Sequence, residues 1–380
     1  MHRKNWQIIN KNGKYRIIVT KELHGKKWIE LMTKEDCRVE ICTSTDILSK
    51  EEIIAAINKK CDGALGQLTE NWDEDIFKRL HKANCKVYSN YAVGYDNVDV
   101  CAATKQGILV GNTPGVLTEA TAEMAVALTF SVARRVVEAD FFMRRMNFKG
   151  WLPSLFLGEL ISRKTLGIIG AGRIGSKYAI MMIKGFNMNL LYFDIKRNRE
   201  LEKEIDNYNK YRKLYEEGQI TYKYINSIEE ILAKADIVSL HPILNKETHH
   251  IINSARLKLM KKNAILINVS RGPVIDELAL IDHCKKNGTF KAGLDVYEEE
   301  PKMKPDLEKL KNIVIVPHIA SATRYTRESM AILAALNIVG ILKNLPANNN
   351  LNNITSFLKD KPPAAVPSII NALELNYPIM

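Results

Sequence analysis

A short apolar run followed by three closely spaced glycines constrains the fold of this chain most strongly. The run covers Thr165–Ile169, and a helix-like stretch follows the glycines as far as Ile183. The order Gly170-x-Gly172-x-x-Gly175 gives each glycine its own expected role. The first permits a tight turn, the second lets backbone amides approach a pyrophosphate, and the third lets the helix pack closely on the strand. Because unpaired N–H groups and the dipole at a helix N-terminus attract phosphate, the stretch predicts a phosphate-binding turn.

The next apolar run supplies the other part of a dinucleotide site. Asn189–Phe193 has the length of a buried strand and ends on Asp194, which lies 19 positions beyond Gly175. A carboxylate about 20 residues after the glycines is placed to accept hydrogen bonds from an adenosine ribose. An ordinary strand–turn–helix can also contain three glycines, but it requires neither the second strand nor the acid. We therefore interpret residues 164–194 as an NAD-binding unit.

Charges near Asp194 give opposing signals on cofactor preference. The carboxylate would repel the 2′-phosphate of NADPH in a partly desolvated crevice. Lys196 and Arg197 follow closely and would attract that phosphate. We expect the two cations to ride on a mobile, solvated segment where their attraction is screened, so that the repulsion dominates. The sequence therefore predicts that NADH is preferred over NADPH.

Length and composition indicate a soluble protein of two domains. A chain of 380 residues is long for a single core. Its apolar fraction of 46% and charged fraction of 26% are typical of globular proteins. No apolar run approaches the roughly 18 residues of a membrane span, and the N-terminus has no apolar core of signal-peptide length. We expect an intracellular protein without a membrane partner.

The cysteines and histidines do not predict a metal site. Six cysteines are scattered without a Cys-x-x-Cys pair, and the eight histidines show no ligand spacing. We interpret the cysteines as reduced, mostly buried thiols of an intracellular protein.

The net charge of +12 raises the question of nucleic-acid binding. The lysines are spread in short pairs such as Lys59-Lys60 and Lys261-Lys262, and no long basic run is interleaved with aromatic residues. A solvated basic surface that attracts an anionic substrate and cofactor explains the charge better. We therefore expect no nucleic-acid partner.

The first 119 residues alternate strand-like and helix-like segments. Ser49 is placed to cap a helix that has Glu51 and Glu52 in its first turn. Such alternation predicts a doubly wound parallel sheet with helices on both faces. Because no dinucleotide motif occurs here, we expect this domain to hold the substrate. The expected strands are Tyr15–Val19, Arg38–Ile41, Gly63–Leu65, Val87–Ser89 and Ile108–Val110.

A long helix over about Ala120–Arg145, capped by Thr118 or Thr121, is expected to cross into the second domain. Gly150-Trp151-Leu152-Pro153 ends the helical pattern, and an apolar cluster around Trp151 follows. That cluster can pack against a partner subunit or against its own chain, and both interpretations stay open.

The second domain, 120–321, continues with strands that end in polar turns. In an open parallel sheet, functional groups collect beyond the carboxyl ends of the strands. The charged stretch 199–218 is expected as a surface insertion. A helix after Ser321 and an irregular tail should return to the first domain, so that 1–119 and 322–380 form one substrate domain. The further strands expected are Ile237–Leu240, Ala264–Val269, Ala292–Val296 and Ile313–Val316.

Three groups at different strand ends fit the needs of hydride transfer to a carbonyl. Arg271 can bind a 2-oxo carboxylate through forked, charge-assisted hydrogen bonds. His318 can give a proton to the developing alkoxide near neutral pH. Glu300 can fix the tautomer of the imidazole and stabilise its protonated form. Each group alone is common in proteins, but three complementary groups at one sheet edge indicate a catalytic site.

These residues stand in stretches that resemble the D-isomer-specific 2-hydroxyacid dehydrogenases over essentially the whole chain, and most of all their plant-type hydroxypyruvate reductase branch. The resemblance implies a Rossmann NAD-binding domain inserted into a flavodoxin-like substrate domain, and a homodimer built on the long helix. It also implies NADH-dependent reduction of hydroxypyruvate to D-glycerate, with glyoxylate to glycolate as a second reaction. The matching stretches include Gly66–Glu70, Ala92–Asp99, Gly111–Glu119, Ser239–Pro242, Ser270–Glu277, Gly293–Val296, Glu298–Pro301 and Pro317–Ser321.

The resemblance assigns roles to individual residues. His318 would be the acid/base paired with Glu300, and Arg271 would bind the carboxylate and carbonyl of a small 2-oxo or 2-hydroxy acid. Leu68 and the backbone amides of Val93 and Gly94, as well as Arg271 and His318, would contact that substrate. The residues implied to bind NAD are Thr118, Gly170, Gly172, Arg173, Ile174, Gly175, Asp194, His241, Pro242, Val269, Ser270, Arg271, Asp295, His318 and Ser321.

Other members of the family stay open as alternatives. Phosphoglycerate dehydrogenase matches less well because no extra C-terminal regulatory domain is present. A formate dehydrogenase is disfavoured because the carboxylate of Glu300, rather than an amide, precedes Pro301. NAD-sensing transcriptional corepressors share the fold, and an intact catalytic set does not exclude such a role.

The C-terminus bears on the expected location. The plant enzymes carry a Ser-Lys-Leu peroxisomal address, whereas this sequence ends Pro378-Ile379-Met380. A cytoplasmic location is therefore expected, and the peroxisome stays open as the alternative.

Overall fold

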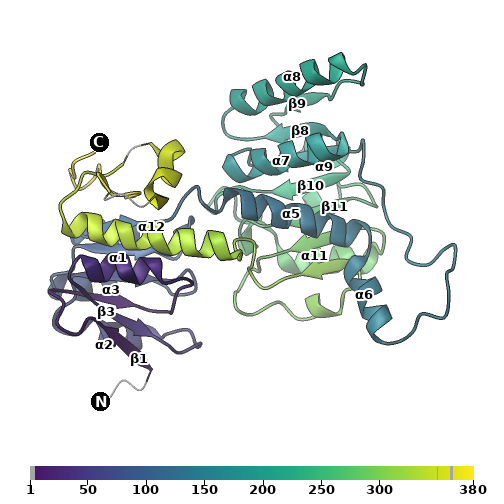
Figure 1. Ribbon diagram of the computed structural model, residues 1–380. Helices are drawn as coiled ribbons and strands as arrows, with labels where there is room; N and C mark the ends of the chain where they lie inside the picture. Colours follow the sequence, from purple (N-terminus) through teal and green to yellow (C-terminus); the bar gives the residue numbers. More distant parts are fainter. Residues whose placement is uncertain (1–4, 349, 360–362) are drawn as a thin grey trace. The chain divides into compact units, whose positions relative to one another are not determined.

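The computed structural model describes residues 5–348, 350–359 and 363–380. The chain divides into two compact units, unit 1 being Met1–Leu117 with Ala322–Met380 and unit 2 being Thr118–Ser321 (Figure 1). Unit 2 therefore lies within the sequence of unit 1. Each unit is built on a sheet of mainly parallel strands, and the predicted fold class is confirmed.

The sheet of unit 1 has the strand order β1-β3-β2-β4-β5-β6. Strands β2 to β6 run parallel, and β2 pairs with both β3 and β4, which is the flavodoxin-like order. The sequence prediction missed β1, which pairs antiparallel with β3 at the sheet edge. This edge strand is held by its pairing with β3, and its four residues, of which Trp6, Ile8 and Ile9 are apolar, are too few to predict a strand alone. The bounds are β1 Trp6–Ile9, β2 Tyr15–Val19, β3 Cys37–Cys42, β4 Gly63–Gly66, β5 Val87–Asn90 and β6 Leu109–Gly111.

Helices cover both faces of this sheet. Helices α2, α3 and α4 pack on one face around a common core, and α12 packs on α1 and on β5. The predicted cap of α2 is confirmed, since Ser49 Oγ accepts from the Glu52 amide at 3.2 Å and Glu52 returns a bond to the Ser49 amide at 2.8 Å. The bounds are α1 Lys27–Lys34, α2 Lys50–Ile57, α3 Glu74–Lys82, α4 Val100–Lys105, α12 Arg324–Leu342 and η3 Leu351–Leu358.

Helix α12 has the length and averaged hydropathy of a membrane span, although it contains no unbroken apolar run of that length. It has 19 residues with a mean hydropathy of 1.2, enough by length and composition to cross a membrane. However, 83% of the 18-residue segment over which this hydropathy is averaged is buried inside the protein. The apolar surface of α12 thus belongs to the core of unit 1.

The sheet of unit 2 is parallel throughout its described strands, in the order β13-β12-β11-β10-β7-β8-β9. Strand β7 pairs with β8 on one side and with β10 on the other, so the strand order reverses at this point. Ligands bind at such a reversal in open parallel sheets. The prediction missed β9, a three-residue edge strand. The bounds are β7 Thr165–Ile169, β8 Asn189–Phe193, β9 Tyr222–Tyr224, β10 Ile237–Leu240, β11 Ile265–Asn268, β12 Lys291–Leu294 and β13 Ile313–Ile315.

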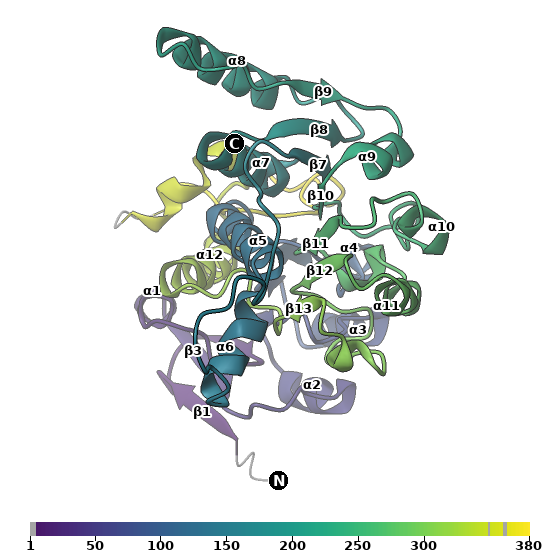
Figure 2. The same cartoon turned by 90° about the vertical axis from the view of Figure 1, so that its right-hand side faces the viewer.

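Helices α5 and α7 cover one face of this sheet, and α9 and α11 cover the other (Figure 2). The charged stretch expected as a surface insertion is helix α8, which buries Leu201 and Ile205 against the core. The bounds are α5 Thr118–Ala133, α6 Val136–Arg144, α7 Arg173–Phe186, α8 Arg199–Leu214, α9 Ile228–Lys234, α10 Ser254–Leu257 and α11 Glu277–Lys286, with short 3₁₀ turns at Gly272–Val274 and Leu307–Lys309.

The single long helix predicted over 120–145 is wrong. Helix α5 ends at Ala133, Arg135 takes a left-handed conformation with φ +54°, and α6 begins after it. The amide of Glu159 donates to the Ala133 carbonyl at 2.8 Å, so a distant segment occupies an acceptor that a continuous helix would use. Gly158 makes this approach possible, since a Cβ there would lie 2.3 Å from the same oxygen.

Candidate active site

The glycine turn after β7 forms an open cradle. Gly170 has φ +93°, and a Cβ on it would lie 2.6 Å from the backbone of His241. A Cβ on Gly175 would lie 2.1 Å from the Gly170 carbonyl oxygen, so α7 packs directly on the turn. Gly172 is the N-cap of α7 without a side-chain hydrogen bond, and nothing lies within 4 Å of where its Cβ would be. The first amides of α7 are therefore left for an anion, which fits the pyrophosphate of a dinucleotide.

The segment after β8 is tied to this glycine turn. Asp194 follows β8, and its carbonyl accepts from the Tyr224 hydroxyl at 3.0 Å. The side-chain Nδ2 of Asn198 donates to the Ala171 carbonyl at 2.7 Å and to Ser176 Oγ at 3.1 Å. Arg197 stands next to Asn198 and donates from Nε to Glu202 Oε1 at 2.7 Å, while its side chain is 45% exposed. The expected mobility of the segment that carries Lys196 and Arg197 stays a prediction.

His318 and Glu300 form a hydrogen-bonded pair beyond the carboxyl ends of β12 and β13. His318 Nδ1 lies 2.8 Å from Glu300 Oε2, with side chains 26% and 23% exposed. The other carboxylate oxygen accepts from the Tyr297 amide at 3.0 Å, which fixes the orientation of Glu300. An ionised carboxylate only accepts, so this geometry assigns the proton to Nδ1. Nε2 then remains to exchange a proton with a substrate.

Asp295 holds the turn that carries His318. Its carboxyl is fully buried, and Oδ1 and Oδ2 accept from the amides of Ile319 at 2.6 Å and Ala320 at 2.9 Å. The carbonyl of Asp295 accepts from the His318 amide at 2.9 Å. His318 itself has φ +52°, an uncommon conformation for a residue with a side chain. Burial raises the pKa of Asp295, against the opposing effect of the two amides.

Arg271 lies in the turn after β11, which packs on the turn after β12. A Cβ on Gly272 would lie 1.8 Å from the Tyr297 carbonyl oxygen, so only glycine allows this contact. The Arg271 carbonyl accepts from the Asn268 side chain at 2.8 Å, and its guanidinium donates to the Ser270 carbonyl at 2.8 Å. The turns that bear Arg271 and Glu300 are thus neighbours within unit 2.

His241 lies directly after β10, against the glycine turn. Its Nε2 lies 2.8 Å from Ser239 Oγ, and Nδ1 is buried without a hydrogen-bond partner in the described part of the chain. Burial lowers the pKa of His241 to about 3, so the imidazole is neutral at physiological pH. The remaining residues implied to bind NAD lie at the start of α5 (Thr118), in the first turn of α7 (Arg173, Ile174), and in the turns after β10 (Pro242), β11 (Val269, Ser270) and β13 (Ser321).

In unit 1, the residues expected to meet the substrate lie in two linked turns. Leu68 follows β4, and Val93 and Gly94 follow β5. The side chain of Asn97 donates to the carbonyls of Gln67 at 3.0 Å and Glu70 at 2.9 Å. Asn90 donates to the Gly94 carbonyl at 3.0 Å and to Asn97 Oδ1 at 3.2 Å. Sequence reasoning missed this link, although both asparagines lie in or beside the motif 92–99.

A cluster of possible metal ligands forms where the sequence showed no ligand spacing. The ligand atoms of His249, His250 and Glu298 lie within 4.8 Å of one another. His250 Nε2 is 2.7 Å from Glu298 Oε1, and the two imidazole rings stack at 4.0 Å. These contacts account for the arrangement without an ion, and the absence of a metal stays a prediction.

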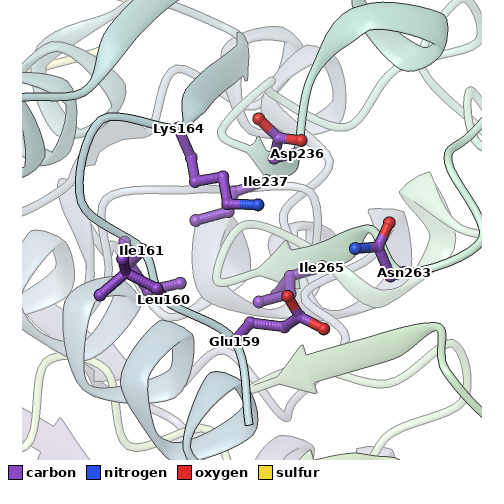
Figure 3. Close-up of a pocket in the computed structure, with 8 residues that line it drawn as sticks. All are labelled: Glu159, Leu160, Ile161, Lys164, Asp236, Ile237, Asn263 and Ile265. Atoms are coloured by element: carbon purple, nitrogen blue, oxygen red, sulfur yellow. The ribbon is translucent and has the colours of Figure 1, made fainter.

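A small pocket lies at the opposite edge of the unit 2 sheet, at the amino ends of β7, β10 and β11 (Figure 3). One of its two acids, Asp236, already accepts from the Thr165 amide and from Lys261 Nζ, both at 2.8 Å. The pocket is therefore separate from the catalytic pair. Its lining residues are Glu159, Leu160, Ile161, Lys164, Asp236, Ile237, Asn263 and Ile265.

Known proteins show the same combination of fold and sequence. The chain is 55% identical over 372 residues to a glycerate dehydrogenase of Cucumis sativus, covering 97% of each protein. It is 54% identical over 376 residues to the peroxisomal glycerate dehydrogenase HPR of Arabidopsis thaliana, covering 98% of this chain and 97% of that one. A solved D-lactate dehydrogenase of Aquifex aeolicus, complexed with NAD and lactic acid, matches with a TM-score of 0.71 and 26% identity over 86% of this chain and 95% of that one.

The match to a family model decides the assignment. Residues 126–320 match the model described as the NAD binding domain of the D-isomer specific 2-hydroxyacid dehydrogenases. That range contains the glycine turn, Asp194 and the His318–Glu300 pair. The chain is therefore a member of the D-isomer-specific 2-hydroxyacid dehydrogenases, NAD-dependent oxidoreductases of small 2-hydroxy acids.

Proposed function

We propose that this enzyme reduces hydroxypyruvate to D-glycerate with NADH, and glyoxylate to glycolate as a second reaction. The observation that carries the proposal is the His318–Glu300 pair at 2.8 Å, on the same sheet edge as the open glycine turn. Relatives named glycerate dehydrogenase and, at 45% identity, glyoxylate reductase of Thermococcus litoralis support these two substrates.

The residues of unit 2 divide the chemistry among them. Bound NADH supplies the hydride. His318 donates the proton from Nε2 to the developing alkoxide, and Glu300 stabilises the resulting charge through Nδ1. Arg271 binds the carboxylate and carbonyl of the substrate, since a guanidinium offers paired donors to a planar anion.

Unit 1 supplies further substrate contacts in this proposal. The backbone amides of Val93 and Gly94 hold the carboxylate, and Leu68 contacts the substrate beside them. Asn97 and Asn90 keep both turns in register through the hydrogen bonds described above. Residues 1–119 and 322–380 then act as the substrate domain, and 120–321 as the cofactor domain.

We propose a preference for NADH over NADPH. Asp194 stands at the end of β8, where an adenosine ribose would be held, and its carboxylate would accept from both hydroxyls. A 2′-phosphate there would meet a fixed negative charge.

We also propose a homodimer formed through the segment after α5. The side chains of Trp151, Leu157 and Leu160 are 80%, 67% and 71% exposed. Phe141 and Met143 on α6 are also more than half exposed. An exposed apolar set of this size is typical of a subunit interface, and a second copy of the chain is the proposed occupant.

Steady-state kinetics of the purified chain test the activity. We expect turnover of hydroxypyruvate and glyoxylate with NADH, at rates far above those with pyruvate-sized acids that lack the hydroxyl or aldehyde. A protein that binds NADH but turns over neither acid would instead support the NAD-sensing alternative.

A further inference from the structure

Arg197 lies three positions after Asp194, on the segment that is tied to the glycine turn after β7. Its neighbour Asn198 is anchored to the Ala171 carbonyl at 2.7 Å and to Ser176 Oγ at 3.1 Å. The backbone N–H of Asn198 also donates to the Tyr192 hydroxyl at 3.1 Å. In folds of this kind an Arg near the ribose-binding acid accommodates the 2′-phosphate of NADPH, and Arg197 is such a residue by its place in the sequence.

The charge of Arg197 is already engaged by Glu202. Arg197 Nε donates to Glu202 Oε1 at 2.7 Å, and the Glu202 side chain is only 6% exposed. The buried Tyr192 hydroxyl donates to the same oxygen at 2.7 Å. Although burial raises the pKa of Glu202, the hydrogen bonds from Arg197 and Tyr192 outweigh it and the net pKa is lowered. Glu202 is therefore a fixed negative charge opposite Arg197.

We propose that Glu202 is a specificity-determining residue that disfavours NADPH by neutralising Arg197. A 2′-phosphate would have to draw the guanidinium away from a carboxylate that is only 6% exposed. That carboxylate would then keep only the Tyr192 hydroxyl and the longer contact with Arg199 Nη1 at 3.6 Å. Asp194 then repels the phosphate while Glu202 withholds the cation that would bind it. The inference rests on the proposed binding of the ribose at Asp194.

Glu202→Gln tests the proposal in the full-length protein. Glutamine keeps the shape and still accepts from Tyr192, but it carries no charge to hold Arg197. The dissociation constants of NAD⁺ and NADP⁺ are measured by titration calorimetry, without turnover. We expect the NADP⁺/NAD⁺ affinity ratio to rise by about tenfold, the scale of one charge-assisted contact.

Glu200→Gln is the matched control. Glu200 lies exposed in the same first turn of α8, so this variant removes an equal charge without touching the Arg197 pair. We expect its affinity ratio to stay within about twofold of wild type, since an exposed charge is screened. In the double variant Glu202→Gln with Arg197→Ala, the rise in the NADP⁺/NAD⁺ affinity ratio should disappear, because the guanidinium that Glu202→Gln releases is absent. An equal change in both single variants, or a gain that survives removal of Arg197, overturns the proposal.

Arg197→Ala alone gives a test that does not depend on the stability of Glu202→Gln. If Glu202 already neutralises Arg197, this variant should change NADP⁺ affinity by less than about twofold. A loss of tenfold would show that Arg197 serves the phosphate in the wild type and would refute the inference. A wild type that favours NADP⁺ would contradict the proposed NADH preference, whereas the comparison of Glu202→Gln with Glu200→Gln still reports on Arg197.

Discussion

Replacing Asp295 with asparagine should show how far catalysis by His318 depends on the turn that positions it. The carboxylate accepts from two backbone amides, those of Ile319 and Ala320. An asparagine side chain has one acceptor oxygen, so its NH₂ group must face one of these N–H groups. Leaving one buried amide without an acceptor costs about 1–3 kcal/mol of the free energy of unfolding.

The same change should lower turnover, because those amides belong to the turn of His318. The left-handed conformation of His318, with φ +52°, persists only where the surroundings hold it. A weakened turn would move Nε2 and disturb the 2.8 Å contact with Glu300. Since a displacement of about 1 Å can cost on the order of 100-fold in rate, we expect kcat for hydroxypyruvate to fall by about 10- to 100-fold.

Asp236→Asn provides the control for this experiment. Asp236 also accepts from a backbone amide, that of Thr165 at 2.8 Å, but at the opposite edge of the same sheet. Thermal unfolding should show comparable destabilisation in both variants, while kcat should fall only in Asp295→Asn. If Asp295→Asn loses no more activity than Asp236→Asn, the carboxylate does not position His318 and the reasoning is refuted.

Five further variants test the remaining assignments. His318→Ala should lower kcat by about two to four orders of magnitude with NADH binding nearly intact, whereas Arg271→Ala should also raise KM; near-normal turnover of His318→Ala would end the assignment. Asp194→Ser should shift kcat/KM toward NADPH, and an unchanged ratio would exclude Asp194 as the discriminator. Trp151→Ala should weaken the dimer in sedimentation and raise KM for hydroxypyruvate, and no change in either contradicts a subunit contact. Because the pKa of His241 is lowered to about 3, only the unfolded state binds a proton at this imidazole between about pH 6.5 and pH 3. The free energy of unfolding should therefore fall by up to about 1.4 kcal/mol per pH unit as the pH is lowered through this range. His241→Gln should reduce this pH dependence in thermal unfolding, and an unchanged pH dependence would contradict the assignment.

The core strands were predictable because each carries its own signal. Thr165–Ile169, Asn189–Phe193 and Ile237–Leu240 have the bounds predicted from their apolar runs. Parallel strands buried on both faces are nearly continuous in apolar residues, so the pattern is local. The edge strands β1 and β9 have only four and three residues, too few to be recognised without the pairing with a neighbour. The break between α5 and α6 depends on Glu159, which is distant in the sequence.

The catalytic groups could be proposed from the sequence, whereas their supports could not. Arg271, Glu300 and His318 follow predicted strands, and parallel strands end at one edge. By contrast, the bond from Arg197 to Glu202 depends on how α8 folds back toward β8. The link of Asn97 to Gln67 spans 30 positions. Contacts of this kind have no periodicity or spacing by which a single sequence reveals them.

The contacts that position the catalytic side chains affect how variants of this enzyme should be interpreted. The turns that carry Arg271, Glu300 and His318 are held through their backbone groups. Glu277, the first residue of α11, accepts from the amides of Glu298 at 2.8 Å and Lys304 at 3.1 Å. Gly272 lets one turn touch the Tyr297 carbonyl, and Asp295 clamps the amides of another. A side chain added at Gly272 would move Arg271 without touching the substrate, because its Cβ would lie 1.8 Å from that carbonyl. A variant at such a position loses activity because a catalytic side chain is displaced, not because a reacting group is removed. Comparison with matched structural variants distinguishes these two causes.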